Sequence, residues 1–175
     1  MKIACLGWGS LIWKPEPLEV VGPWHEDGPH VPVEFCRVAD GSELATAICL
    51  TTSPLPVYWA VLASADLAEA CQTLKAREQI PAHRGDAIGS LIVREDDQGV
   101  LGRWAAAREL DAVVWTALPP RYANIENRMP SQVDVIEYLG SLTGDALEHA
   151  KRYIQRVPPQ IRTPYRSAIE QTFGW

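Results

Sequence analysis

Short apolar runs separated by turn residues dominate the N-terminal part of the chain. Runs of this length without helical spacing predict buried strands, and their content of Val, Ile, Thr and aromatic residues favours the same structure. We therefore predict strands over residues 3–6, 31–38, 44–51, 55–63, 87–94 and 112–117.

The segments between these strands differ in character. Turn residues at 40–42 (D-G-S) and 53–54 (S-P) predict that three successive strands form consecutive hairpins. Residues 15–30 are dense in Pro, Gly and charged residues, which predicts an exposed loop. A further turn is expected at 96–99 (D-D-Q-G), whereas residues 100–109 fit either a strand or a short helix.

Helical spacing of apolar residues first occurs between two of the predicted strands. Ser64 is the expected N-cap of a helix over 65–77, in which Leu67, Cys71 and Leu74 recur at helical intervals. The helix is expected to end near Glu78, because Pro81 follows shortly after.

The C-terminal part of the chain is helical in pattern. From Ser131 a helix is predicted with an apolar face of Val133, Ile136, Tyr138 and Leu139. A second helix over 146–156 carries its apolar residues at Leu147, Ala150, Tyr153 and Ile154. A third helix over 165–173 is preceded by Thr163 and Pro164, an N-cap residue and a first-turn proline. Strands first and helices last predict an α+β fold, and 175 residues are enough for one domain spanning 1–175.

The first predicted strand opens directly into a glycine-containing loop. The loop comprises Gly7, Trp8, Gly9, Ser10, Leu11 and Ile12. Glycine lets a ligand approach the main chain closely, and consecutive backbone N–H groups in a turn can bind a carboxylate or phosphate, or stabilise an oxyanion. For an isolated G-x-G, a tight turn between two elements is the commoner interpretation. A dinucleotide-binding loop is excluded, because position 12 is Ile and Pro15 and Pro17 interrupt the helix that such a loop needs.

Charge and cysteine content narrow the class of protein. A formal net charge of −6 argues against nucleic acid as the main partner. The four cysteines form no C-x-x-C pair, so we expect no zinc site and interpret them as reduced residues of a cytoplasmic protein. The acidic and His residues within 25–30 are expected to be solvated rather than metal-binding. No stretch is long and apolar enough to predict a membrane span.

Three segments carry a resemblance to a known family. Residues 7–15, G-W-G-S-L-I-W-K-P, resemble the G-Y-G-S-L-I-W-K-P signature of the ChaC branch of the gamma-glutamylcyclotransferase superfamily. Residues 74–80, L-K-A-R-E-Q-I, resemble its L-D-x-R-E segment, and residues 137–144 resemble its E-Y-L segment. Two positions depart from the family pattern, because Trp8 stands in place of Tyr and Lys75 in place of Asp.

The resemblance implies a fold, a reaction and a set of site residues. The implied fold is a mixed β-barrel with flanking helices and a helical C-terminal part. The implied enzyme cyclises a gamma-glutamyl group to 5-oxoproline and releases the attached amine or amino acid, as in glutathione metabolism. Glu78 would be the general acid/base, and the loop over 7–12 would hold a small-molecule gamma-glutamyl substrate. No cofactor and no metal is implied, and no oligomeric state is predicted.

A non-catalytic binding module for small molecules on the same fold is the alternative. The surroundings of Glu78 distinguish the two. A buried, unpaired Glu78 facing the glycine loop favours the enzyme, whereas an exposed Glu78 paired with Arg77 favours the module. Glutathione, gamma-glutamyl amino acids and gamma-glutamylated metabolites share the group that the loop would hold, so the leaving amine stays open.

Overall fold

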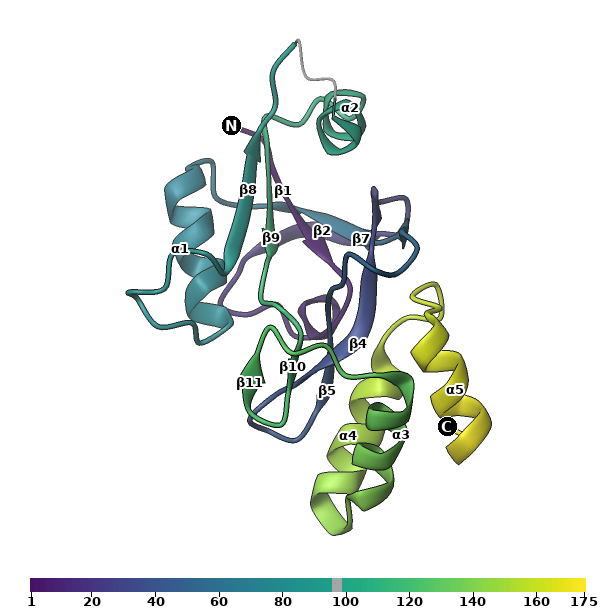
Figure 1. The fold of residues 1–175 in the computed structure, drawn as a ribbon. Helices are drawn as coiled ribbons and strands as arrows, with labels where there is room; N and C mark the ends of the chain where they lie inside the picture. The colour runs from purple at the N-terminus through teal and green to yellow at the C-terminus, as the bar shows by residue number, and fades with distance from the viewer. Residues whose placement is uncertain (96–98) are drawn as a thin grey trace. The chain divides into compact units, whose positions relative to one another are not determined.

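The computed structural model describes residues 1–95 and 99–175, so the predicted turn at 96–99 lies mostly outside the described residues (Figure 1). The described chain forms two compact units. Unit 1 comprises Met1–Gly7, Leu11–His30 and Pro56–Leu118, and unit 2 comprises Trp8–Ser10, Val31–Leu55 and Pro119–Trp175. Two of the crossings between them fall within short strands, β3 (His30–Val31) and β6 (Leu55–Pro56).

Unit 1 is built on a five-stranded sheet with the order β2-β7-β1-β9-β8. The strands are β1 (Ile3–Gly7), β2 (Val20–His25), β7 (Tyr58–Leu62), β8 (Ile88–Ile92) and β9 (Ala112–Thr116). The central strand β1 is buried at every residue, runs antiparallel to β7 and runs parallel to β9. A strand buried on both faces reads as a continuous apolar run, which is why the N-terminal segment was recognisable from sequence.

Helix α1 (Leu67–Arg77) covers one face of this sheet, against β8 and β9 (Figure 1). Its buried residues Ala70 and Leu74 join Ile3, Cys5 and Val114 in one apolar core. The predicted helix is confirmed, but its N-cap is Asp66 rather than Ser64. The Asp66 side chain accepts a hydrogen bond from the Glu69 amide, as N-cap carboxylates do.

Unit 2 combines a four-stranded sheet with three helices. The sheet order is β11-β10-β4-β5, with β4 (Val33–Val38), β5 (Leu44–Ile48), β10 (Arg121–Tyr122) and β11 (Ile125–Glu126). The helices are α3 (Gln132–Ser141), α4 (Gly144–Arg156) and α5 (Pro164–Phe173). Helix α4 packs against β5, α5 against β4, and α3 against α5. The α+β class predicted from sequence is confirmed.

Helix capping in unit 2 follows the local sequence closely. The Ser131 hydroxyl accepts a hydrogen bond from the Asp134 amide, and the Asp134 carboxylate accepts one from the Ser131 amide in return, forming a capping box. Thr163 caps α5, with Pro164 in the first turn as predicted. The face of α3 differs from the prediction, because Val133 is 64% exposed and the buried residues are Val135 and Leu139.

The segment 15–30 is not the continuous loop that its composition predicts, because it contains β2. This strand lies at the sheet edge, where a missing amide hydrogen does not interrupt a ladder, so Pro23 is tolerated. Gly22 adopts a φ of +78°, and the register with β7 shifts between Val21 and His25. The Pro and Gly residues therefore shape an irregular edge strand rather than prevent one.

Two further predictions are corrected, and one open alternative is resolved. The pair β4 and β5 forms the expected antiparallel hairpin, but β7 pairs with β1 and β2 instead of continuing it. The ambiguous segment 100–109 contains a helix, α2 (Val100–Ala106). No sheet among the described residues closes into the implied β-barrel, since β2 and β8 end one main sheet and β11 and β5 end the other.

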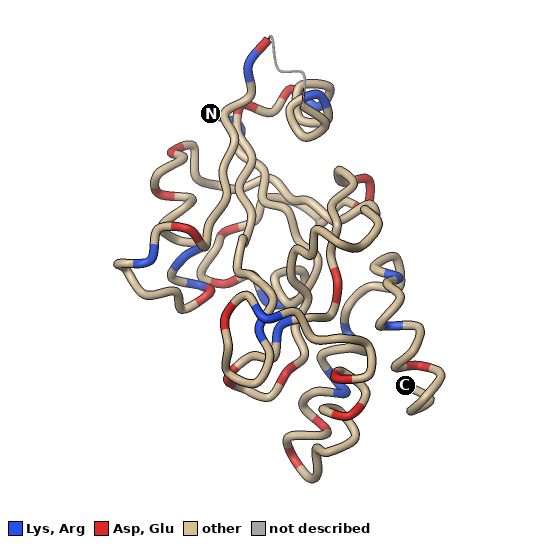
Figure 2. Tube along the Cα trace, viewed as in Figure 1, with Lys and Arg blue, Asp and Glu red and all other residues tan. Residues whose placement is uncertain are grey.

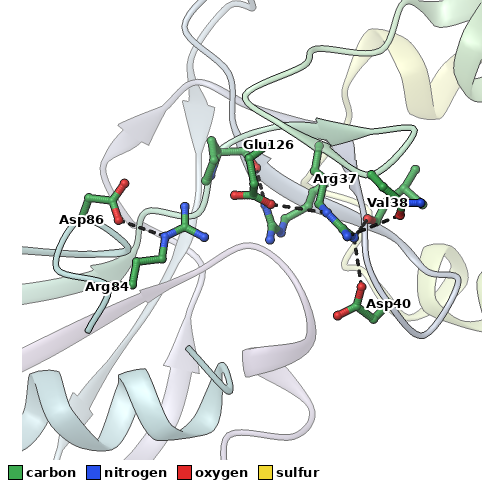
Figure 3. A network of polar contacts seen from close by, with 9 residues as sticks. Arg37, Val38, Asp40, Arg84, Asp86 and Glu126 are labelled. Atoms are coloured by element: carbon green, nitrogen blue, oxygen red, sulfur yellow. Dashed lines mark hydrogen bonds and ion pairs between the residues drawn. The ribbon is translucent and has the colours of Figure 1, made fainter. Parts of the chain in front are cut away.

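Arginines in the sheet of unit 2 are paired with carboxylates (Figure 3). One oxygen of Glu126 accepts from Arg37 at 2.9 Å and lies 3.4 Å from the Arg121 guanidinium. Arg121 also contacts Asp40 at 3.1 Å and donates to the Val38 carbonyl. These contacts of Arg37 and Arg121 tie β10 and β11 to β4. In both units, Lys and Arg are interspersed with Asp and Glu (Figure 2).

Glu34 of β4 is a buried carboxyl group, 1% exposed. Its oxygens accept from the Phe35 amide at 2.8 Å and the Tyr165 amide at 3.3 Å, at the N-terminus of α5. Burial raises the pKa of Glu34 above its ordinary value of 4.5, against the opposing effect of hydrogen bonds from Thr163 and these amides.

This raised pKa gives a stability prediction. As the pH rises above the ordinary carboxyl value, the unfolded chain releases a proton that folded Glu34 still holds, so the free energy of unfolding falls. We expect Glu34→Gln to flatten this decline in urea denaturation measured from about pH 4 to pH 7. Glu137→Gln, on an exposed position of α3, is the control and should keep the native slope. An unchanged slope in Glu34→Gln would contradict the assignment.

Candidate functional site

The backbone of unit 1 brings two strand ends to one edge of the sheet. Strands β1 and β9 are parallel, and Ile3 pairs with Ala112 while Cys5 pairs with Val114. The same offset carried to the strand ends brings Gly7 level with Thr116. The start of the glycine loop and the end of β9 therefore share one edge, because parallel strands end on the same side of a sheet.

Glu78 lies at the C-terminus of α1, where its amide bonds to the Leu74 carbonyl. Its carboxylate is bound on one oxygen: Thr116 Oγ1 donates to Oε1 at 3.1 Å, and Arg77 Nη1 lies 3.3 Å from the same atom. The other oxygen, Oε2, accepts no hydrogen bond from the residues that the structure describes. A carboxylate held by one oxygen keeps a fixed direction while the second oxygen can exchange a proton.

Arg77 connects this carboxylate to the chain that follows the loop. Its Nη2 donates to the Lys14 carbonyl at 2.7 Å and its Nε donates to the same oxygen at 3.2 Å. Because Nη1 faces Glu78, one planar guanidinium orients both groups. The Arg77 and Glu78 side chains are only 12% and 17% exposed, so the pair is largely shielded from water.

The electrostatics of β1 support the same placement. Burial above all, and then the charge of Glu78, raise the pKa of the Cys5 thiol, while Arg77 acts in the opposite direction. Cys5 lies two residues before Gly7 on the buried central strand. The charge of Glu78 is therefore felt at the middle of β1, within unit 1.

The glycines of the loop are explained by neighbouring side chains rather than by unusual backbone angles, because neither Gly7 nor Gly9 has a positive φ. A Cβ on Gly7 would lie 2.7 Å from the ring of Trp24. A Cβ on Gly9 would lie 2.6 Å from both the Thr46 hydroxyl and the Tyr153 hydroxyl. Each glycine is needed because another part of its own unit approaches the main chain closely.

Trp8 is one of the two departures from the family pattern, and its surroundings indicate what its side chain does. Its side chain is only 5% exposed and its carbonyl oxygen accepts from Thr46 Oγ1 at 2.9 Å. The indole is therefore a packing group rather than a solvent-facing donor. The other departure, Lys75, donates to the Ala82 carbonyl at 3.0 Å on the surface of unit 1.

The predicted site residues are divided between the units. Gly7, Leu11, Ile12 and Glu78 belong to unit 1, and Trp8, Gly9 and Ser10 belong to unit 2. Ser10–Ile12 form a short 3-10 helix in which Leu11 is buried. Thr116, the partner of Glu78, is not among the site residues predicted from the sequence. The signal was a hydroxyl residue at the end of an otherwise apolar predicted strand, but only strand pairing shows that this end meets the start of the loop.

No group of three or more His, Cys, Asp and Glu residues in the described part of the chain is arranged to hold a metal ion. None of the four cysteines forms a disulfide bond. Cys5, Cys36 and Cys49 are buried, and Cys71 is partly buried. None of the helices within the described ranges has the length and apolar character needed to cross a membrane.

Comparison with protein-family models gives no match to the chain. Comparison with curated proteins likewise gives none.

Proposed function

We propose that the protein is a gamma-glutamyl cyclotransferase-type enzyme that converts a gamma-glutamyl group to 5-oxoproline and releases the attached amine. One observation carries the proposal: the Glu78 carboxylate is bound through one oxygen by Thr116, at the sheet edge where the glycine loop begins. The resemblance of residues 7–15 and 74–80 to the ChaC branch supports the same assignment. A gamma-glutamylcyclotransferase-like fold and a cytoplasmic location are parts of this proposal.

The reaction needs positioning and one proton carrier. The α-amine of the gamma-glutamyl group attacks its own side-chain carbonyl carbon, so a C–N bond forms in a five-membered ring. The bond from that carbon to the leaving amine then breaks. Glu78 takes a proton from the attacking nitrogen and gives it to the leaving amine, so protons balance without water or a cofactor. Because the attack is intramolecular, holding the substrate bent supplies much of the acceleration.

Backbone N–H groups of the loop over 7–12 would bind the α-carboxylate and the oxyanion that develops on the attacked carbonyl. Thr116 and Arg77 would keep Oε1 of Glu78 occupied, leaving Oε2 to carry the proton. This division suits a group that must act first as base and then as acid from one position.

The contact between Arg77 and Glu78 favours the second candidate, a non-catalytic binding module for small molecules. The surroundings of Glu78 combine a feature of each candidate function. The side chain is largely shielded from water, as expected for the enzyme, yet it is paired with a cation at 3.3 Å, as expected for the module. In a binding module, this pair would be a structural clamp on the chain at Lys14, and the loop would bind an anionic ligand without turning it over.

The test is an assay for 5-oxoproline after incubation with glutathione, gamma-glutamyl amino acids and gamma-glutamylated amines. We expect product from at least one compound, and the compound that reacts identifies the leaving amine. Binding of a gamma-glutamyl compound by calorimetry with no product from any of them would favour the module. Neither binding nor product would reject both assignments.

A further inference from the structure

Three groups of unit 2 meet at the middle of the glycine loop. The Thr46 hydroxyl on β5 lies 2.9 Å from the Trp8 carbonyl oxygen and 3.2 Å from the hydroxyl of Tyr153, on α4. The Thr46 amide also lies 3.2 Å from the Tyr153 hydroxyl. Tyr153 is 9% exposed, Trp8 is 5% exposed and Thr46 is partly buried, so these contacts are partly shielded from water.

The number of protons on each group determines the direction of each hydrogen bond. Thr46 Oγ1 has one proton, and the Trp8 carbonyl can only accept, so Thr46 donates to Trp8. The proton between the two hydroxyls must then come from Tyr153. The Tyr153 oxygen in turn accepts from the Thr46 amide. The chain of bonds is directional, and its end point is the Trp8 carbonyl.

Anchoring this carbonyl fixes the next amide. The Trp8 carbonyl and the Gly9 N–H belong to one planar peptide group, and in a trans peptide they point in opposite directions. With the carbonyl directed at Thr46, the Gly9 N–H points away from Thr46. It has no acceptor among the residues that the structure describes.

The absence of a side chain at Gly9 is part of the same arrangement. A Cβ there would meet both hydroxyls at 2.6 Å, so any larger residue would displace the groups that hold the peptide. A glycine with no positive φ is thus required by the hydroxyl pair, not by backbone strain.

We propose that Thr46 and Tyr153 are positioning residues that aim the Gly9 N–H at an oxygen of the gamma-glutamyl group. This inference rests on the proposed function and names one specific donor within the loop. A preset N–H is a stronger donor to a developing charge than a mobile one, because no reorganisation is needed at the moment of reaction.

Matched variants of Thr46 test the inference. Thr46→Val removes the hydroxyl and keeps the shape, whereas Thr46→Ser keeps the hydroxyl and loses only a methyl group. We expect Thr46→Val to lower kcat/KM for 5-oxoproline release by about 10- to 100-fold, the usual scale for a misplaced catalytic group. Thr46→Ser should stay near the native value. A fall in kcat would indicate that Gly9 serves the developing oxyanion, and a rise in KM that it holds the α-carboxylate.

Amide NMR of the labelled protein supplies a readout that does not need turnover. The Gly9 amide resonance should shift on addition of glutathione in the native protein and in Thr46→Ser, and shift much less in Thr46→Val. Tyr153→Phe, which removes the proton donor to Thr46, should fall between them. The rest of the amide spectrum reports whether each variant is folded.

The outcomes separate this inference from the proposed function. Native activity that Thr46→Val retains in full would overturn the positioning role and leave the reaction intact. No product from the native protein, with a Gly9 shift lost in Thr46→Val, would reject the reaction and support the donor as part of a binding site. A Gly9 amide that stays unshifted in the native protein with every gamma-glutamyl compound of the panel would overturn the inference.

Discussion

Replacing Glu78 with Gln is expected to lower the rate of 5-oxoproline release by about 1,000-fold, the scale of a lost general acid/base. The substitution is well suited to the site, because the Gln carbonyl oxygen can still accept from Thr116 and Arg77 as Oε1 does. The amide cannot exchange the proton that the reaction moves. Substrate binding should change much less than kcat, so the loss belongs to the chemical step.

Glu69→Gln is the matched control for this experiment. Glu69 lies in the first turn of the same helix, where its carboxylate accepts from the Ser64 hydroxyl at the surface. We expect native kinetics from it. Equal product from native protein and Glu78→Gln would remove Glu78 from the mechanism, whatever the substrate proves to be.

The largest expected effect on stability comes from replacing Arg166, a residue only 5% exposed in unit 2. It donates to four backbone carbonyls at and beyond the end of α4, those of Ile154, Val157, Pro158 and Ile161. Helix ends leave carbonyls unsatisfied, and a cation there also opposes the negative end of the helix dipole.

Arg166→Met should therefore lower the free energy of unfolding by about 3–5 kcal/mol, because it leaves several buried acceptors without donors. Urea denaturation followed by circular dichroism measures this difference. Arg166 lies 3.5 Å from the Glu170 carboxylate, and Arg162 pairs with the same carboxylate but has a side chain that is 50% exposed, so Arg162→Met is the control. It should cost less than about 1 kcal/mol, as exposed ion pairs do. Similar losses in the two variants would contradict the role of the buried carbonyl contacts.

Local pattern was enough to find most elements. The apolar run at β1, the capping residues Ser131 and Thr163, and the spacing in α4 each depend on neighbours a few residues away. Errors arose where tertiary context decided the outcome. Pro23 was compatible with β2 only because that strand is an edge, which composition does not reveal.

Some residues of the candidate site could be predicted from the sequence, and others could be found only in the folded structure. Sequence resemblance alone pointed to Glu78 and to the loop over 7–12, and that assignment stays a prediction. Thr116 could not be paired with Glu78 from sequence, since 38 positions separate them and the contact depends on β9 lying parallel to β1. The packing role of Trp8 likewise does not follow from the sequence, because its burial depends on the tertiary structure.

Local sequence patterns are sufficient to predict the α+β class, the position of the glycine loop and the end of α1 at Glu78, because capping and periodicity act over short distances. The reason why the loop needs its glycines becomes visible only in the folded protein. The Trp24 ring and the hydroxyls of Thr46 and Tyr153 approach from residues far along the chain. Such close approaches depend on side-chain packing, which no local pattern encodes.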